Sequence, residues 1–142
     1  MGPASPDPLE AAVRALAHRD LSQHELAERL ARRGVPESDR RQAIERLTRA
    51  GYVDDDRFAL GRAQGLAERG RSDAAIRADL EERGVEPELV EQALGSLAPE
   101  AERARVQAAR LGGGLRAARA LARKGFAAES VESAVGLEGP EP

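Results

Sequence analysis

Residues 26–35 read LAERLARRGV, and this pattern returns twice more along the chain. Residues 76–85 read IRADLEERGV, and residues 118–126 read ARALARKGF. Each copy has a leucine four residues before a glycine, a basic residue directly before that glycine and an apolar residue directly after it. The glycines lie 50 and 41 residues apart, and repetition at periods of about 20–50 residues is typical of stacked supersecondary units. The sequence therefore predicts a tandem array of three similar units.

The composition of the 142-residue chain favours an all-α fold. Aromatic residues make up 2% of the chain, and alanine, leucine and valine supply most of its apolar content. Alanine and leucine are strong helix formers, whereas strands prefer β-branched and aromatic residues. The chain has no cysteine, which excludes disulfides, thiolate zinc sites and cysteine nucleophiles. No apolar run approaches the roughly 20 residues that span a bilayer, and the first residues lack a signal-peptide pattern, so we expect a cytoplasmic protein without membrane contact.

Helical periodicity and capping residues divide the sequence into three units of three short helices. We place a disordered tail at 1–8, the three units at 9–53, 54–98 and 99–137, and a frayed tail at 138–142. The first helix is expected from about Leu9 to His18. Units this small are not expected to bury separate cores, so neighbours should share one. The expected architecture is all-α, with three tandem three-helix repeats in an elongated, curved array of right-handed helices.

Three glycines and a capping motif are expected to set the helix ends. Ser22 and Glu25 fit a capping box, in which each side chain satisfies a free backbone N–H at the start of a helix. Gly34, Gly84 and Gly125 each follow the middle helix of a unit, where a left-handed glycine commonly ends a helix.

The few aromatic side chains are assigned to the core. We expect Tyr52, Phe58 and Phe126 to lie in the shared core at the joints between units.

The sequence offers little for catalysis. His18 and His24 are expected on different helices, with no cysteine or carboxylate spacing that would make them a metal pair. Helix capping explains Ser22 better than nucleophilic catalysis does, and it also explains the acidic run 54–56. The glycines at 112–114 lack the Gly-Lys-Ser/Thr of a phosphate loop, so a helix break is the better interpretation. We therefore expect no enzymatic activity, no metal and no cofactor.

Charge is distributed unevenly along a chain whose net charge is −3. Basic residues outnumber acidic ones nine to seven in the first unit and seven to four in the third, whereas the second unit has six basic and eleven acidic residues. The residues before the three glycines are Arg33, Arg83 and Lys124. Such cations either complement the partial negative charge at a helix C-terminus or form a ridge that binds phosphates or an acidic protein groove.

One alternative fold is a winged-helix DNA-binding domain over residues 21–53. The stretch has a capped helix, a turn, a second helix and a Gly-Tyr-Val sequence that resembles the entry to a wing. Two observations argue against it: the residues after Val53 are acidic and helix-forming, and the motif recurs twice more.

Residues 51–59, GYVDDDRFA, closely resemble the junction motif of the RecX regulatory proteins, which are bacterial. The LSxxEL block that begins at Leu21 and the closing RKGF at 123–126 fit the same family, so the resemblance covers about 9–137. It implies a crescent of three three-helix repeats that binds the RecA recombinase along the groove of its filament on DNA. It also implies negative regulation of RecA's ATPase and strand exchange, in homologous recombination, DNA repair and the SOS response.

We therefore predict a non-enzymatic modulator, monomeric in the simplest case, whose partners are the RecA filament and single- or double-stranded DNA within it. The alternative is a winged-helix-like transcriptional regulator that acts on DNA without RecA. The residues predicted to contact the partner or DNA are Arg29, Arg32, Arg33, Arg83, Arg110, Arg116, Arg119, Arg123 and Lys124.

Overall fold

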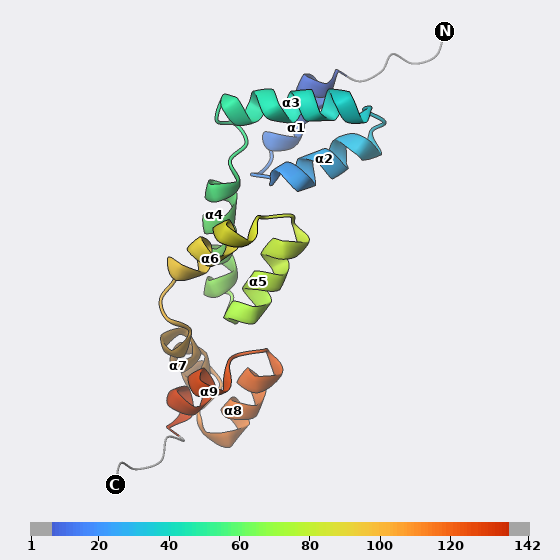
Figure 1. The fold of residues 1–142 in the computed structure, drawn as a ribbon. Coiled ribbons are helices and arrows are strands. Elements are labelled where there is room, and N and C mark those ends of the chain that lie inside the picture. The colour runs from blue at the N-terminus through green and yellow to red at the C-terminus, as the bar shows by residue number, and fades with distance from the viewer. Residues whose placement is uncertain (1–6, 137–142) are drawn as a thin grey trace.

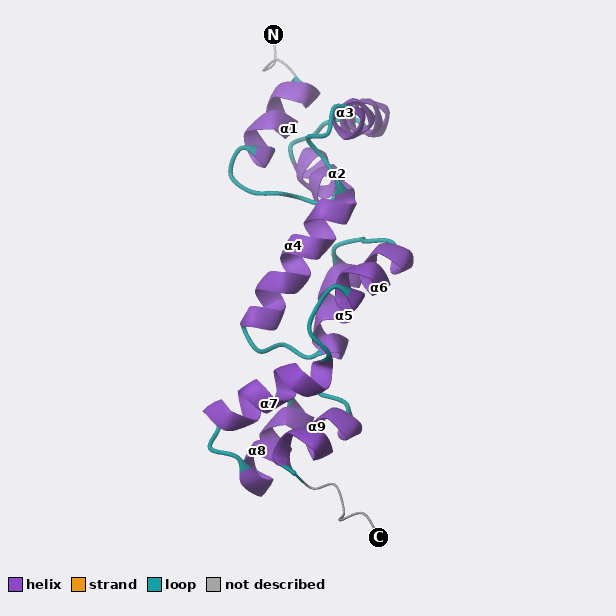
Figure 2. Cartoon of the chain, turned by 90° about the vertical axis from the view of Figure 1, so that its left-hand side faces the viewer, coloured by secondary structure: helices purple, strands orange, loops and turns teal. Residues whose placement is uncertain are grey.

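The computed structural model describes residues 7–136, and nine helices and no strands occur in that range. Their bounds are α1 (Pro8–Leu16), α2 (Gln23–Arg32), α3 (Glu37–Arg49), α4 (Asp55–Glu68), α5 (Asp73–Glu82), α6 (Pro87–Gly95), α7 (Glu100–Arg110), α8 (Gly114–Arg123) and α9 (Ala128–Val135). The helices form three successive groups along an elongated molecule (Figures 1 and 2). The predicted all-α architecture of tandem three-helix repeats is confirmed.

Each repeat has its own hydrophobic core, so the expectation of a core shared between neighbours is wrong. The first cluster joins α1–α3 around Leu26 and Leu30, the second joins α4–α6 around Ile76 and Leu80, and the third joins α7–α9 around Leu121. Alanines such as those of α7 and α8 let the helices approach closely, and a few leucines then suffice to fill each centre. The joints between repeats therefore do not have to supply apolar core contacts, and polar groups can connect the repeats there.

The helix ends follow local capping rules. Ser22 and Glu25 form the predicted capping box at the start of α2. The first helix begins earlier than expected, because the Asp7 side chain accepts a hydrogen bond from the N–H of Leu9 and caps α1 at Pro8. Asp7 and Pro8 are therefore ordered rather than part of a tail, and α1 ends at Leu16. The rest of the first predicted tail, and all of the second, lie outside the described residues.

The three predicted helix-ending glycines have positive φ angles of 84° at Gly34, 77° at Gly84 and 92° at Gly125. Each lets the next residue turn back onto the helix that has just ended. The N–H of Val35, for example, donates to the carbonyl of Leu30 at 3.1 Å. The apolar side chain after each of these glycines is thereby placed in the core.

The assignment of Tyr52 to the core is wrong, because 65% of this residue is exposed. The N–H groups of both Tyr52 and Val53 bond to the carbonyl of Leu47, and this turn directs Val53 inward, where only 1% of it is exposed. Phe58 and Phe126 are buried as predicted, but each belongs to the core of its own repeat.

Two equivalent polar joints connect the repeats. At the first, Ser22 Oγ donates to the carbonyl of Arg83 at 2.7 Å, and Asp55 Oδ1 accepts the N–H of Gln23 at 2.9 Å. At the second, Ser72 Oγ donates to the carbonyl of Lys124 at 3.2 Å. There a carboxylate at the start of α7, Glu100, accepts the N–H of Asp73 at 2.8 Å. At each joint, the start of one middle helix meets the end of the next.

The chain after Val53 forms helix α4, capped by Asp54, whose carboxylate accepts the N–H of Arg57. No wing hairpin exists in residues 7–136, because no strand occurs there. None of the helices in this range is both long and apolar enough to cross a bilayer.

Candidate partner-binding surface

Helix α8 presents a face made of arginines. Ala117, Ala118 and Leu121 are its buried residues, and at about 100° per residue the three arginines of the helix fall within about 60° of one another on the opposite side. These arginines, Arg116, Arg119 and Arg123, are exposed and form no ion pair with any described residue. The helix itself, GLRAARALAR, contains no acidic residue. The α8 arginine face is therefore free to bind an anionic partner.

The remaining predicted cations divide between the two ends of the molecule. Arg110 and Lys124 are exposed in the third repeat, and Arg32 and Arg33 are exposed at the end of α2, with Arg29 partly buried beside them. None of these five has an ion-pair partner among residues 7–136. Helices α2 and α8, which carry five of the nine predicted cations, and α5 between them follow one another along the same side of the molecule (Figure 1).

Arg83 differs from the other predicted cations, because it is ion-paired within the protein. Its guanidinium lies 2.5 Å from Glu25 Oε2 and 2.9 Å from Asp79 Oδ1, with 27% of the side chain exposed. Asp79 is also held by Arg62 at 2.8 Å. Hydrogen bonds from Arg62 and then Arg83 hold the pKa of Asp79 below its ordinary value. Arg83 therefore fastens the second repeat to the first, and the basic ridge is interrupted in the middle.

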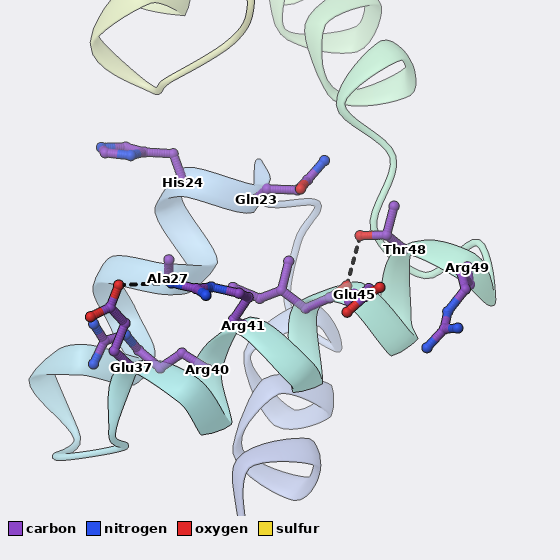
Figure 3. A pocket seen from close by; sticks show the side chains of 10 residues that line it. Gln23, His24, Ala27, Glu37, Arg40, Arg41, Glu45, Thr48 and Arg49 are labelled. Carbon is purple, nitrogen blue, oxygen red and sulfur yellow. Dashed lines mark hydrogen bonds and ion pairs between the residues drawn. The ribbon is translucent and has the colours of Figure 1, made fainter.

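A groove between α2 and α3, about 740 Å³ in volume, was not predicted from the sequence (Figure 3). Ala27 and Ile44 are among its lining residues. In the second repeat, 50 residues later, an ion pair between Arg77 and Glu91 spans the corresponding place. The charged side chains of the groove are partly committed to internal partners, since Arg41 pairs with Glu37 at 3.0 Å.

The other chemical groups considered in the sequence have structural surroundings. His24 lies 3.0 Å from Glu28 in the next turn of α2. Within the described part of the chain, no three histidine or carboxylate side chains are grouped so as to hold a metal ion. Gly112, Gly113 and Gly114 all have positive φ angles; the first two lie in the turn between α7 and α8, and Gly114 begins α8.

The fold and its surface define an elongated, tandem three-helix repeat protein with unpaired cations in its first and third repeats and an ion-paired Arg83 in its second. Residues 9–47 match the family described as "RecX, first three-helix domain", and residues 54–94 match "RecX, second three-helix domain". The chain belongs to the RecX family.

Similar proteins agree with this assignment. The chain is 34% identical to a "Regulatory protein RecX" of Halorhodospira halophila, over 94% of this chain and 89% of the relative. It is 38% identical to the "Regulatory protein RecX" of Mycobacterium ulcerans over 67% of this chain, and that match spans 56% of the longer mycobacterial protein. Among solved structures, RecX from Lactobacillus salivarius superposes with a TM-score of 0.79 at 17% identity, over 92% of this chain and 93% of that one.

Proposed function

We propose that this protein binds the RecA filament and lowers its ATPase and strand-exchange activities. Membership of a family whose relatives are named regulatory proteins supports a regulatory role. The choice of surface rests on the α8 arginine face, which has no ion-pair partner among residues 7–136 and no acidic residue on its own helix. RecA is the partner because the junction at 51–59 resembles that of the RecX proteins.

The proposed mechanism is occupation of the filament groove. An elongated molecule of three repeats is suited to lie along a helical groove and to contact successive RecA subunits. Several weak contacts on one rigid body then combine into strong binding, because the second contact becomes intramolecular. Binding across subunits would favour one filament state over another and would exclude DNA that has to enter the groove.

The α8 arginine face and the end of α2 are the proposed contacts. We propose Arg116, Arg119, Arg123 and Lys124 as the principal residues, with Arg29, Arg32, Arg33 and Arg110 in support. Guanidinium groups suit this role because each presents a planar fork that pairs with carboxylates or phosphates through two hydrogen bonds.

The test is inhibition of the DNA-dependent ATPase of RecA by the intact chain and by two triple variants. R116E/R119E/R123E removes the α8 arginine face, and R14E/R41E/R46E reverses the same amount of charge at exposed positions of α1 and α3. We expect the first variant to lose inhibition at least tenfold and the control to keep it. Equal inhibition by all three proteins would refute the assignment of this face.

Failure of the unmodified chain to inhibit RecA or to bind its filament would refute the proposed function itself. The alternative, a DNA-binding regulator independent of RecA, predicts instead strong and steeply salt-dependent binding to naked duplex DNA. Measuring duplex binding with and without the RecA filament separates these two functions.

A further inference from the structure

Three cations surround a hollow at the joint between the second and third repeats. Arg69, Gly70, Arg71 and Lys124 line a cavity of about 270 Å³. Arg69 is the C-cap residue of α4, Arg71 follows in the loop to α5, and Lys124 is the C-cap residue of α8. All three side chains are exposed, and none makes an ion pair with another residue in the range 7–136. Cations from three different segments therefore converge without an internal anion.

The helix ends at this joint do not account for the amount of positive charge. The C-terminal ends of α4 and α8 each carry about half an elementary negative charge, which sums to about −1 against three full positive charges. The carboxylates of the same joint are already engaged. Glu100 accepts the N–H groups of Asp73 and Ala127, and Asp73 is ion-paired with Arg103. A positive charge of about two units is left at the hollow.

The hollow is preformed by packing between the repeats. Gly70 has a φ of +83°, and a Cβ added to it would come within 2.6 Å of Gln107 Oε1 on α7. The loop that carries Arg69 and Arg71 is therefore pressed directly against the third repeat. This contact holds the loop beside α7 of the third repeat, the repeat whose helix α8 is followed by Lys124.

A second hollow of about 290 Å³ lies along α4, and Arg69 lines both. Asp20 and Glu25 also line the second hollow, where their carboxylates are paired with Arg57 and Arg83. Gly61 and Gly65 lie in it, with no atom outside their own helix neighbourhood within 4 Å of an added Cβ. We treat the two hollows together as one groove along α4. This helix is about 21 Å long and spans the middle repeat (Figure 2). Arg19 borders its far end without an ion-pair partner among the described residues, whereas Arg57 pairs with Asp20.

We propose that this groove binds the phosphodiester backbone of a single DNA strand, with Arg69, Arg71 and Lys124 as the principal contacts and Arg19 as an outlying one. The flexible backbone of a single strand can bring its phosphates to cations that lie on different segments, here the end of α4, the loop after it and the end of α8. Guanidinium forks suit phosphate oxygens. The groove has no exposed aromatic platform, since its one phenyl ring, Phe58, is 7% exposed. Binding is therefore independent of base sequence.

This inference rests on the proposed function for its setting, the DNA enclosed by a RecA filament, but its test uses DNA alone. The dissociation constant for a 30-residue oligothymidylate is measured by fluorescence anisotropy at several salt concentrations. The proteins compared are the intact chain, R69Q/R71Q and R14Q/R46Q, which removes the same charge on α1 and α3. For single strands the slope of log K against log salt is about −0.7 for each phosphate contact. We expect the slope to become shallower by about 1.4 in R69Q/R71Q and to stay unchanged in R14Q/R46Q.

Equal slopes for the three proteins would overturn the proposal. It would also be overturned if inorganic phosphate bound the hollow while the oligonucleotide bound no more tightly than free phosphate, or if polyglutamate competed as well as DNA. Thermal denaturation verifies that the variants fold, which is expected because all four substituted arginines are exposed. RecA ATPase inhibition by R69Q/R71Q is a separate readout, so loss of DNA binding and loss of RecA regulation are distinguishable.

Discussion

The hydroxyl of Ser22 donates a hydrogen bond to the carbonyl of Arg83, a residue 61 positions later in the sequence. The same oxygen accepts the N–H of Glu25 and caps α2. One buried hydroxyl therefore begins a helix in the first repeat and holds the end of a helix in the second.

Ser22→Ala should lower the free energy of unfolding by about 1–3 kcal/mol, because it removes a helix cap and leaves the partly buried carbonyl of Arg83 without this hydrogen bond. Urea denaturation measures this loss. Ser38→Ala, at an exposed position of α3, is the control and should change stability by less than about 0.5 kcal/mol. Indistinguishable stabilities of the two variants would mean that the joint does not depend on this hydroxyl.

Gly84→Ala should destabilise the protein far more than Gly34→Ala. Both glycines have positive φ angles, so the backbone strain of an alanine is similar at the two sites, about 1 kcal/mol. They differ in surroundings: a Cβ at Gly84 would lie 2.3 Å from the Cβ of His24, whereas nothing lies within 4 Å at Gly34. The difference between the two melting temperatures isolates the contact across the joint, and equal melting temperatures would argue against close packing there.

Phe126→Ala should cost about 3–5 kcal/mol, because the ring is 5% exposed in the third core. Tyr52→Ala should cost less than about 0.5 kcal/mol, because the tyrosine is mostly exposed. Chemical denaturation of the two variants compares these values directly. A large loss for the tyrosine variant would restore its assignment to the core.

Stability should decline in acid partly through Glu100. Burial raises the pKa of this carboxyl, but hydrogen bonds from the N–H groups of Ala127 and Asp73 outweigh it, and its pKa lies below the ordinary 4.5. The folded state then binds fewer protons than the unfolded chain near pH 4. The stabilisation is complete above about pH 5.5 and is lost as the pH falls through the folded pKa.

Glu100→Gln should therefore reduce stability at pH 7 by about 1–2 kcal/mol, since glutamine offers one acceptor oxygen for the two N–H groups. Its stability should also fall less steeply between about pH 5 and pH 3 than that of the unmodified protein. Denaturant titrations at several pH values test both expectations. Glu132→Gln, an exposed control in the same repeat, should leave the acid slope unchanged; the opposite result would locate the dependence elsewhere.

What could be predicted from the sequence was governed by neighbours along the chain. The capping box of Ser22 and Glu25 and the left-handed Gly34 depend on residues within one helical turn, and all formed as expected. The threefold repetition could also be recognised, because each copy contains its own leucine and glycine at the same spacing.

What could not be predicted depends on contacts between repeats. Arg83 resembled Arg33 and Lys124 in the sequence, but its partner Glu25 lies 58 residues earlier and becomes its neighbour only after the first joint forms. Tyr52 and Val53 are both apolar residues after Gly51, and only the geometry of that turn decides which one is buried. The hollow at Arg69 and Arg71 likewise exists only where two repeats meet.

The joints also align the dipoles of the three middle helices head to tail. The negative end of α5 contacts the positive end of α2, and the negative end of α8 contacts the positive end of α5. Of the three middle helices α2, α5 and α8, the last is the one whose positive end has no such neighbour. There Gly113 supplies no capping side chain, and the first turn has no acidic residue. The negative end left over is that of α2, where Arg29 and Arg32 offset it. The two ends of the protein are therefore not equivalent, and a groove that itself has a direction would accept it one way round.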